Sequence, residues 1–167
     1  MIITYVVVMM LTALGTIAAA FMVTFLEDKF FSKTIKIPFE GKVDPASFPV
    51  ITLYNDDNPV SFLVDSGSNI SHINSSELSW IKHEDIKDSN MSVVGMEGNE
   101  VIVGRCTIEL TCNGKTIVEE FAKTNLDSIH DTIMETRGIE IEGILGGTFL
   151  KKNNGIIDYN NMRLHIK

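Results

Sequence analysis

The sequence predicts an all-β domain, a barrel or a sandwich, preceded by a membrane-spanning helix. Short β-branched runs recur about every ten residues after residue 33, and turn residues separate them. The 14 basic and 22 acidic residues all lie after Leu26, so the first 26 residues form an uncharged apolar head. The rest of the chain has the length of one domain, which excludes a multidomain enzyme.

The predicted strands alternate in polarity or are rich in β-branched residues. They are residues 34–37, 50–54, 60–64, 101–103, 106–111 and 115–121. Residues 55–59 contain Asn, Asp and Pro, which predicts a turn and hence a hairpin between the second and third strands. Asn113-Gly114 is the strongest two-residue hairpin signal, so the last two strands are predicted to form a second hairpin.

Helical signals are confined to two stretches, residues 75–81 and 148–152. Ser75 or Ser76 is the predicted N-cap of the first stretch. Trp80, in the same stretch, is expected to pack in the core. Residues 127–138 fit either a third short helix or a loop.

The uncharged head is predicted to be a transmembrane anchor over residues 1–26. As a helix, residues 2–26 would span about 37 Å, which exceeds the roughly 30 Å of a bilayer's hydrocarbon core. A cleaved signal peptide and a buried core helix are the alternatives. The head has no basic n-region and its apolar run is longer than that of a signal peptide, so the anchor is favoured.

The predicted organisation is therefore an anchor, a charged linker over residues 27–33 and a folded domain over residues 34–167. Lysines follow the anchor at positions 29, 33, 36 and 42. The positive-inside tendency then predicts a single-pass membrane protein whose C-terminal domain faces the cytoplasm.

Charge and ligand spacing argue against several kinds of partner. The net charge of -8 leaves no cationic surplus to displace phosphate counterions, so no nucleic-acid partner is expected. Cys106 and Cys112 lie on one predicted strand, roughly 20 Å apart, which is too far for a disulfide. The histidines, His72, His83, His130 and His165, lack metal-ligand spacing. We therefore expect neither a metal nor a cofactor.

The residue with the clearest chemical signal is Asp65, because an apolar strand, residues 62–64, runs directly into it. Burial disfavours an ionised carboxylate unless hydrogen-bond donors or opposite charges stabilise it. Gly67 allows the backbone to bring N–H groups towards the carboxylate, and the hydroxyls of Ser66 and Ser68 are further donors.

Residues 62–67, Phe-Leu-Val-Asp-Ser-Gly, resemble the active-site turn of the retropepsin-like aspartic proteases. Residues 144–150, Ile-Leu-Gly-Gly-Thr-Phe-Leu, are similar to that family's apolar-apolar-Gly segment and short helix. Residues 155–159 and 162–166 resemble its closing strands. The resemblance covers most of residues 35–166 in the expected order, and it implies a single-lobe β-barrel with one or two short helices.

The resemblance also implies a homodimer, because the chain has one Asp-Ser-Gly and the family's enzyme needs a pair of aspartates. Two Asp65 carboxylates would share a proton and activate a water that attacks a peptide bond of a polypeptide substrate. By resemblance, Ser66 would bond across the dimer axis and Ser68 would orient the carboxylate. Gly146 would let the Asp65 loop approach closely, which is a supporting role.

Residues 93–101 have apolar flanks around a glycine-rich tip and look like the family's substrate-covering flap. The tip residues are Gly95, Met96, Glu97 and Gly98. An ordinary exposed hairpin is the alternative.

The chain also departs from the family pattern in two places. Gly147 and Thr148 stand where many relatives have polar or charged residues. Residues 122–141 could be an insertion near the cleft or the dimer edge.

The sequence therefore predicts a membrane-anchored aspartic endopeptidase that is active as a homodimer. The alternative is a catalytically silent protease-like module that binds an extended peptide by strand addition or serves for dimerisation. A purely structural membrane-tethered β-domain has the least support. The intact Asp65-Ser66-Gly67 favours the enzyme, because a silent module has no chemical need for the carboxylate.

Overall fold

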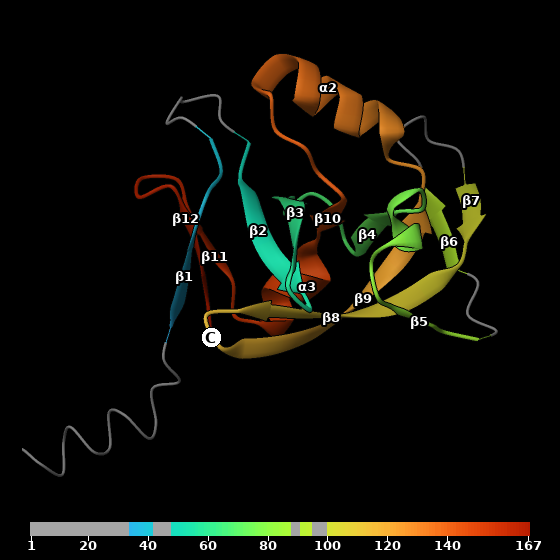
Figure 1. Ribbon diagram of the computed structural model, residues 1–167, viewed down its shortest axis with the longest axis horizontal. Helices are drawn as coiled ribbons and strands as arrows, with labels where there is room; N and C mark the ends of the chain where they lie inside the picture. The colour runs from blue at the N-terminus through green and yellow to red at the C-terminus, as the bar shows by residue number, and fades with distance from the viewer. Residues whose placement is uncertain (1–33, 42–47, 88–90, 95–99) are drawn as a thin grey trace, which may run out of the picture. The chain divides into compact units, whose positions relative to one another are not determined.

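Short strands and few helices make up the described part of the protein, as Figure 1 shows for the computed structural model. The structure describes residues 34–41, 48–87, 91–94 and 100–167. The described elements, in chain order, are β1 (Ile35–Pro38), β2 (Val50–Asn55), β3 (Asn58–Val64), β4 (Ser71–Asn74), the 3-10 helix η1 (Glu77–Ser79), β5 (Glu84–Asp85), β6 (Met91–Val94), β7 (Glu100–Val103), β8 (Arg105–Cys112), β9 (Lys115–Thr124), α2 (Asp127–Arg137), β10 (Gly143–Leu145), α3 (Gly147–Lys152), β11 (Ile156–Asp158) and β12 (Arg163–Ile166). Ile35–Ile166 pack together as one unit.

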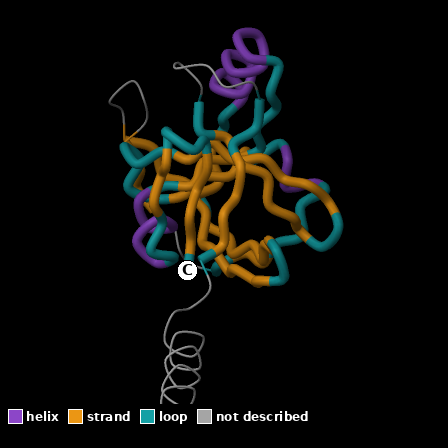
Figure 2. Tube along the Cα trace, turned by 90° about the vertical axis from the view of Figure 1, so that its left-hand side faces the viewer, coloured by secondary structure: helices purple, strands orange, loops and turns teal. Residues whose placement is uncertain are grey.

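The main sheet of this unit closes on itself. Its strands follow the order β2-β3-β10-β4-β9-β8-β5, and a further pairing of β2 with β8 places Tyr54 opposite Thr111. Figure 2 shows these strands curving around a common interior. A second sheet has the order β1-β12-β11, and β6 pairs with β7. The strand spacing predicted a barrel or a sandwich, and the described residues form a mostly-β barrel.

Both predicted hairpins are present. β2 and β3 pair from Val50 opposite Leu63 to the turn, and β8 and β9 are joined at Asn113-Gly114. Asn113 has a φ of 49° and Gly114 a φ of 79°, the left-handed conformations that favour Asn-Gly in a two-residue hairpin. β8 also carries both cysteines, which are free, in agreement with the prediction that they lie too far apart for a disulfide. Both thiols are buried.

The predicted helices differ from the observed ones in length. The stretch 75–81 contains only the 3-10 helix η1, and the hydroxyl of Ser76 does not cap it. The prediction for Trp80 was wrong, because its side chain is 42% exposed and its Nε1 donates to Glu77 Oε2 at 2.7 Å. Residues 127–138, for which helix and loop were both open, form α2, and Gly138 ends it with a φ of 66°.

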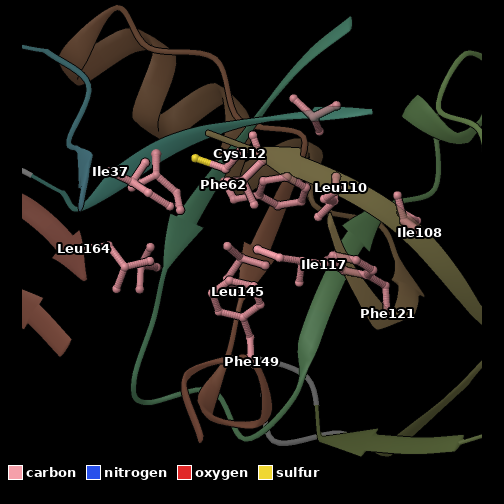
Figure 3. Packing of buried hydrophobic residues seen from close by; sticks show 14 of the residues in the cluster. Ile37, Phe62, Ile108, Leu110, Cys112, Ile117, Phe121, Leu145, Phe149 and Leu164 are labelled. Atoms are coloured by element: carbon pink, nitrogen blue, oxygen red, sulfur yellow. The ribbon is translucent and has the colours of Figure 1, made fainter. Parts of the chain in front are cut away.

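The core lies inside the barrel, where aromatic and aliphatic side chains of several strands meet (Figure 3). Phe62 of β3 and Phe121 of β9 stack with ring centroids 5.7 Å apart, and both are fully buried. A smaller cluster outside the barrel joins Val50 of β2 to Ile133 of α2 and to Ile141. Through this cluster α2 covers part of the β2–β3 hairpin, which fixes the position of β3 from both sides.

No sequence pattern predicted β4, whose residues are Ser-His-Ile-Asn. The strand lies between β10 and β9, and Ser71, Ile73 and Asn74 are all buried. Asn74 Nδ2 donates to Asp127 Oδ1 at 2.9 Å, and Asn74 Oδ1 accepts from Leu126 N at 3.1 Å. Because distant residues satisfy its polar groups, a polar segment can form a central strand here.

Several predictions fall on residues that the structure does not describe. The anchor over residues 1–26, the linker over residues 27–33 and the flap tip at residues 95–98 all lie there. Within the described part of the chain, no helix is long and apolar enough to cross a bilayer.

Candidate active site

Asp65 follows the last residue of β3, where two parallel strands end together. β3 pairs in parallel with β10, so that Val64 lies opposite Leu145. The backbone N–H of Asp65 continues this ladder and donates to Leu145 O at 3.0 Å. Val64 and Leu145 are buried while Asp65 is half-buried, so the core strand delivers the carboxylate to the edge of the barrel.

The turn after Asp65 supplies a backbone donor to the carboxylate. Gly67 N donates to Asp65 Oδ1 at 2.8 Å, and Ser68 N donates to Asp65 O at 3.2 Å. A Cβ on Gly67 would lie 3.1 Å from Asp65 Oδ1, which is tighter than an ordinary contact. The structure thus contains the backbone donor that the sequence predicted, and the missing side chain at Gly67 gives it room.

The two serines of the turn differ from each other in the structure. Ser68 Oγ donates to Ile70 O at 2.8 Å, so its hydroxyl closes the turn and does not orient Asp65 as predicted. The carbonyl of Ile70 lies within reach of the hydroxyl inside the same turn, which explains the difference. Ser66 is exposed, and its predicted bond to a second copy of the chain stays a prediction.

Gly146 lies directly against the Asp65 loop. A Cβ at Gly146 would be 2.1 Å from Ile70 O and 2.5 Å from Ile70 C, so only glycine fits without a shift of the backbone. Next to it, Gly147 N donates to Ser68 O at 2.7 Å and Thr148 N donates to Asn69 O at 3.1 Å. The backbone amides of Gly147 and Thr148 therefore hold the loop in place.

Two polar residues beside the loop were not predicted. Ser71 is fully buried, and its Oγ donates to Glu119 Oε1 at 2.8 Å and accepts from Gly146 N at 3.2 Å. Glu119 is 3% exposed, and burial raises the pKa of its carboxyl. Glu119 follows Ser71 by 48 residues in the chain, so no local motif could have connected them.

His72 is a half-buried titratable group close enough to Asp65 for their charges to interact. Burial lowers the pKa of His72, and the negative charge of Asp65 opposes this shift. Its Nδ1 is 3.0 Å from Thr124 Oγ1. The described residues contain no group of His, Cys, Asp and Glu side chains that could hold a metal ion.

The arms of the predicted flap form a β-hairpin. β6 and β7 pair antiparallel from Met91 opposite Val103 to Val94 opposite Glu100. Gly95, Met96, Glu97 and Gly98, which would form the tip, lie outside the described residues. The closure of the predicted flap over a substrate therefore stays a prediction.

A cavity of about 930 Å³ lies between α2 and the beginning of β3, and Ser61, Met134 and Glu142 are among its lining residues. Asp65, at the other end of β3, does not line it. Glu142 Oε2 accepts from Ser61 N at 2.5 Å, which ties the segment after α2 to β3. The cavity is thus separate from the candidate catalytic centre.

Comparison with known proteins establishes the fold. No protein-family model matches the chain, and no curated protein matches it. Among solved structures, the chain is similar to the retroviral protease-like domain of Ddi1 from Leishmania major, with a TM-score of 0.52 and 18% identity over 73% of this chain and 90% of that chain.

Two further structures are similar to the chain at TM-scores below that of the Ddi1 domain. A retropepsin-like aspartic protease from Rickettsia conorii has a TM-score of 0.48 and 12% identity over 80% of this chain and 90% of that chain. EIAV protease complexed with the inhibitor HBY-793 has a TM-score of 0.45 and 16% identity over 66% and 92%. The likeness to the Ddi1 domain confirms the predicted retropepsin-like fold, and the activity has to be argued from the site.

Proposed function

We propose that the protein is an aspartic endopeptidase whose active site forms between two copies of the chain. The observation that carries the proposal is the Asp65 turn: a half-buried carboxylate at the end of a core strand, with Gly67 N 2.8 Å from Asp65 Oδ1, in a retroviral protease-like fold. The chain has one Asp-Ser-Gly, so one copy supplies one such carboxylate. A symmetric homodimer supplies two.

Paired carboxylates provide the acid and the base for peptide hydrolysis. Two carboxylates a few ångströms apart share a proton, because both cannot be ionised cheaply. The ionised member takes a proton from water as the water oxygen bonds to the peptide carbonyl carbon. The protonated member donates to the carbonyl oxygen, and the C–N bond then breaks as the amine leaves with a proton.

The predicted flap tip, the predicted anchor and Ser66 have supporting roles in this proposal. Residues 95–98 close over an extended polypeptide and exclude water from the cleft. Residues 2–26 anchor the chain in a membrane, with the C-terminal domain on the cytoplasmic side. Two anchors in one bilayer raise the effective concentration of the lobes and favour their pairing. Ser66 bonds across the dimer axis.

The test uses the full 167-residue chain in detergent micelles or vesicles. A diverse peptide library is incubated with wild type and with Asp65→Asn, from acidic to neutral pH, and products are identified by mass spectrometry. Asp57→Asn is the matched control, because Asp57 is an exposed aspartate in the turn before β3. We expect cleavage by wild type and by Asp57→Asn, and none by Asp65→Asn.

Mixing the variants tests whether the site needs two copies. If each dimer needs two Asp65 carboxylates, an equal amount of Asp65→Asn added to wild type reduces the activity to about half, because subunits pair at random. Unchanged activity after subunit exchange would contradict the shared site. A wild type that dimerises but cleaves no better than Asp65→Asn would favour the catalytically silent binding module.

A further inference from the structure

Glu119 is a carboxylate buried beside the candidate catalytic loop. It lies on β9 opposite Ile108 of β8, and it is 3% exposed. No other acidic residue in the described part of the chain is buried to this degree. Burying a carboxylate costs free energy unless its partners compensate, so the position of Glu119 requires a structural reason.

The ion pair of Glu119 is a weak explanation for its burial. Lys152 Nζ lies 3.9 Å from Glu119 Oε2, and the Lys152 side chain is 59% exposed. A pair with an exposed lysine at this distance contributes little, because water screens it. The shorter contact is the hydrogen bond from Ser71 Oγ to Glu119 Oε1, at 2.8 Å in a fully buried site.

This hydrogen bond sets the direction of the Ser71 hydroxyl. A serine hydroxyl has one proton and two lone pairs, and an ionised carboxylate can only accept. Donation to Glu119 therefore leaves the lone pairs of Ser71 Oγ for Gly146 N, which donates to that oxygen at 3.2 Å. Glu119 thus makes Ser71 an acceptor for the amide of Gly146.

Gly146 lies in the middle of the segment that holds the Asp65 loop. Leu145 O, just before it, accepts from Asp65 N at 3.0 Å. The next two residues donate their amides to the loop carbonyls of Ser68 and Asn69. The described contacts therefore form a continuous path from Glu119 through Ser71 and the 145–148 backbone to Asp65.

We propose that Glu119 is a positioning residue for Asp65, which acts through Ser71 to hold residues 145–148 against the catalytic loop. Its effect on hydrolysis rests on the proposed function, whereas its effect on loop order does not. The carboxylate does not touch a substrate. Its contribution is to keep Asp65 in one place when the second copy and the substrate arrive.

The test compares three single variants of the full chain. Glu119→Leu removes the acceptor at similar side-chain volume, and Glu119→Gln keeps an oxygen that can accept from Ser71. Glu120→Gln is the matched control, because Glu120 neighbours Glu119 on β9 but is paired with Arg105, with a side chain that is 45% exposed. Measurements are amide hydrogen exchange at residues 65 and 146–148, and kcat and KM for a cleaved peptide.

We expect Glu119→Leu to exchange about tenfold faster at these four amides and to lose about tenfold in kcat, with a smaller change in KM. Glu119→Gln restores exchange and kcat towards wild type, and Glu120→Gln changes neither. Equal acceleration throughout β2 and β3 would indicate global destabilisation and would overturn the positioning role. Wild-type exchange in Glu119→Leu would overturn it as well.

The role of Glu119 stays testable if a variant fails to fold or if wild type cleaves no peptide. If Glu119→Leu does not fold, Ser71→Ala removes the same acceptor from Gly146 with the loss of one oxygen, and exchange must accelerate at the same amides. If wild type cleaves no peptide, the proposed function fails, and the exchange pattern alone still decides whether Glu119 orders the loop.

Discussion

Replacing Gly146 with alanine tests how tightly the Asp65 loop is packed against the junction of β10 and α3. Gly146 has φ −93° and ψ −170°, an extended conformation that any residue adopts, so the backbone itself would not be strained. The new Cβ would lie 2.1 Å from Ile70 O, whereas ordinary contact begins at 3.4 Å. The carbonyl of Ile70 must therefore retreat by about 1.3 Å, the difference between these distances.

Such a retreat breaks the contacts that hold the loop. The bonds of 2.7 Å from Gly147 N to Ser68 O and of 3.1 Å from Thr148 N to Asn69 O would both become too long. Overpacking and two weakened backbone hydrogen bonds together lower the free energy of unfolding by about 3 kcal/mol. Urea unfolding followed by far-ultraviolet circular dichroism measures this change.

Gly104→Ala is the matched control, because a Cβ at Gly104 meets only Lys123 Cδ, at 3.7 Å. We expect this variant to stay within about 0.5 kcal/mol of wild type. If Gly146→Ala unfolds at the same urea concentration as Gly104→Ala, the loop accommodates the added methyl group without a loss in the free energy of unfolding. Close packing at Gly146 would then not be what fixes the position of Asp65.

Further predictions concern the core and the buried polar groups. Phe62→Ala removes the ring stacked on Phe121 and should cost about 3–5 kcal/mol in urea unfolding, and a loss below about 1 kcal/mol would show that the interior relaxes. Asn74→Ala should accelerate amide exchange in α2 before it does so in β8, and uniform exchange would contradict its local role. Burial raises the pKa of Cys106 to about 11, so iodoacetamide at about pH 8 should modify this thiol only after unfolding, and rapid labelling of the native protein would contradict this. Burial also raises the pKa of Glu142, so the stability due to its neutral carboxyl is lost as the pH rises through that pKa. Glu142→Gln should therefore gain stability relative to wild type as the pH rises above about 4, and a pH-independent difference would be inconsistent with the shift.

The sequence predicted the features of the fold that depend on neighbouring residues. Asn113-Gly114 specifies its hairpin because the two left-handed conformations suit these residue types. The backbone donor to Asp65 could be predicted in the same way, because Gly67 lies two residues further along the chain. Local chemistry was sufficient for these elements.

Features that depend on distant partners could not be predicted. β4 has no apolar alternation, and its buried Ser71 and Asn74 are satisfied by Glu119 and Asp127, which lie 48 and 53 residues later. Trp80 is a different case: its large aromatic side chain predicted a core position, but its indole bonds to Glu77, three residues earlier, and the residue stays exposed. Tertiary contacts decided the outcome at Ser71 and Asn74.

The position of β10 has a consequence for how the protein is made. This strand lies between β3 and β4, and it pairs Leu145 with Val64, which was synthesised much earlier. Pairing of segments so far apart in the chain is slow, because a long loop must close first. On the ribosome, the Asp65 loop therefore lacks its supporting backbone until residues 143–148 have emerged, and it takes its final shape only after that point.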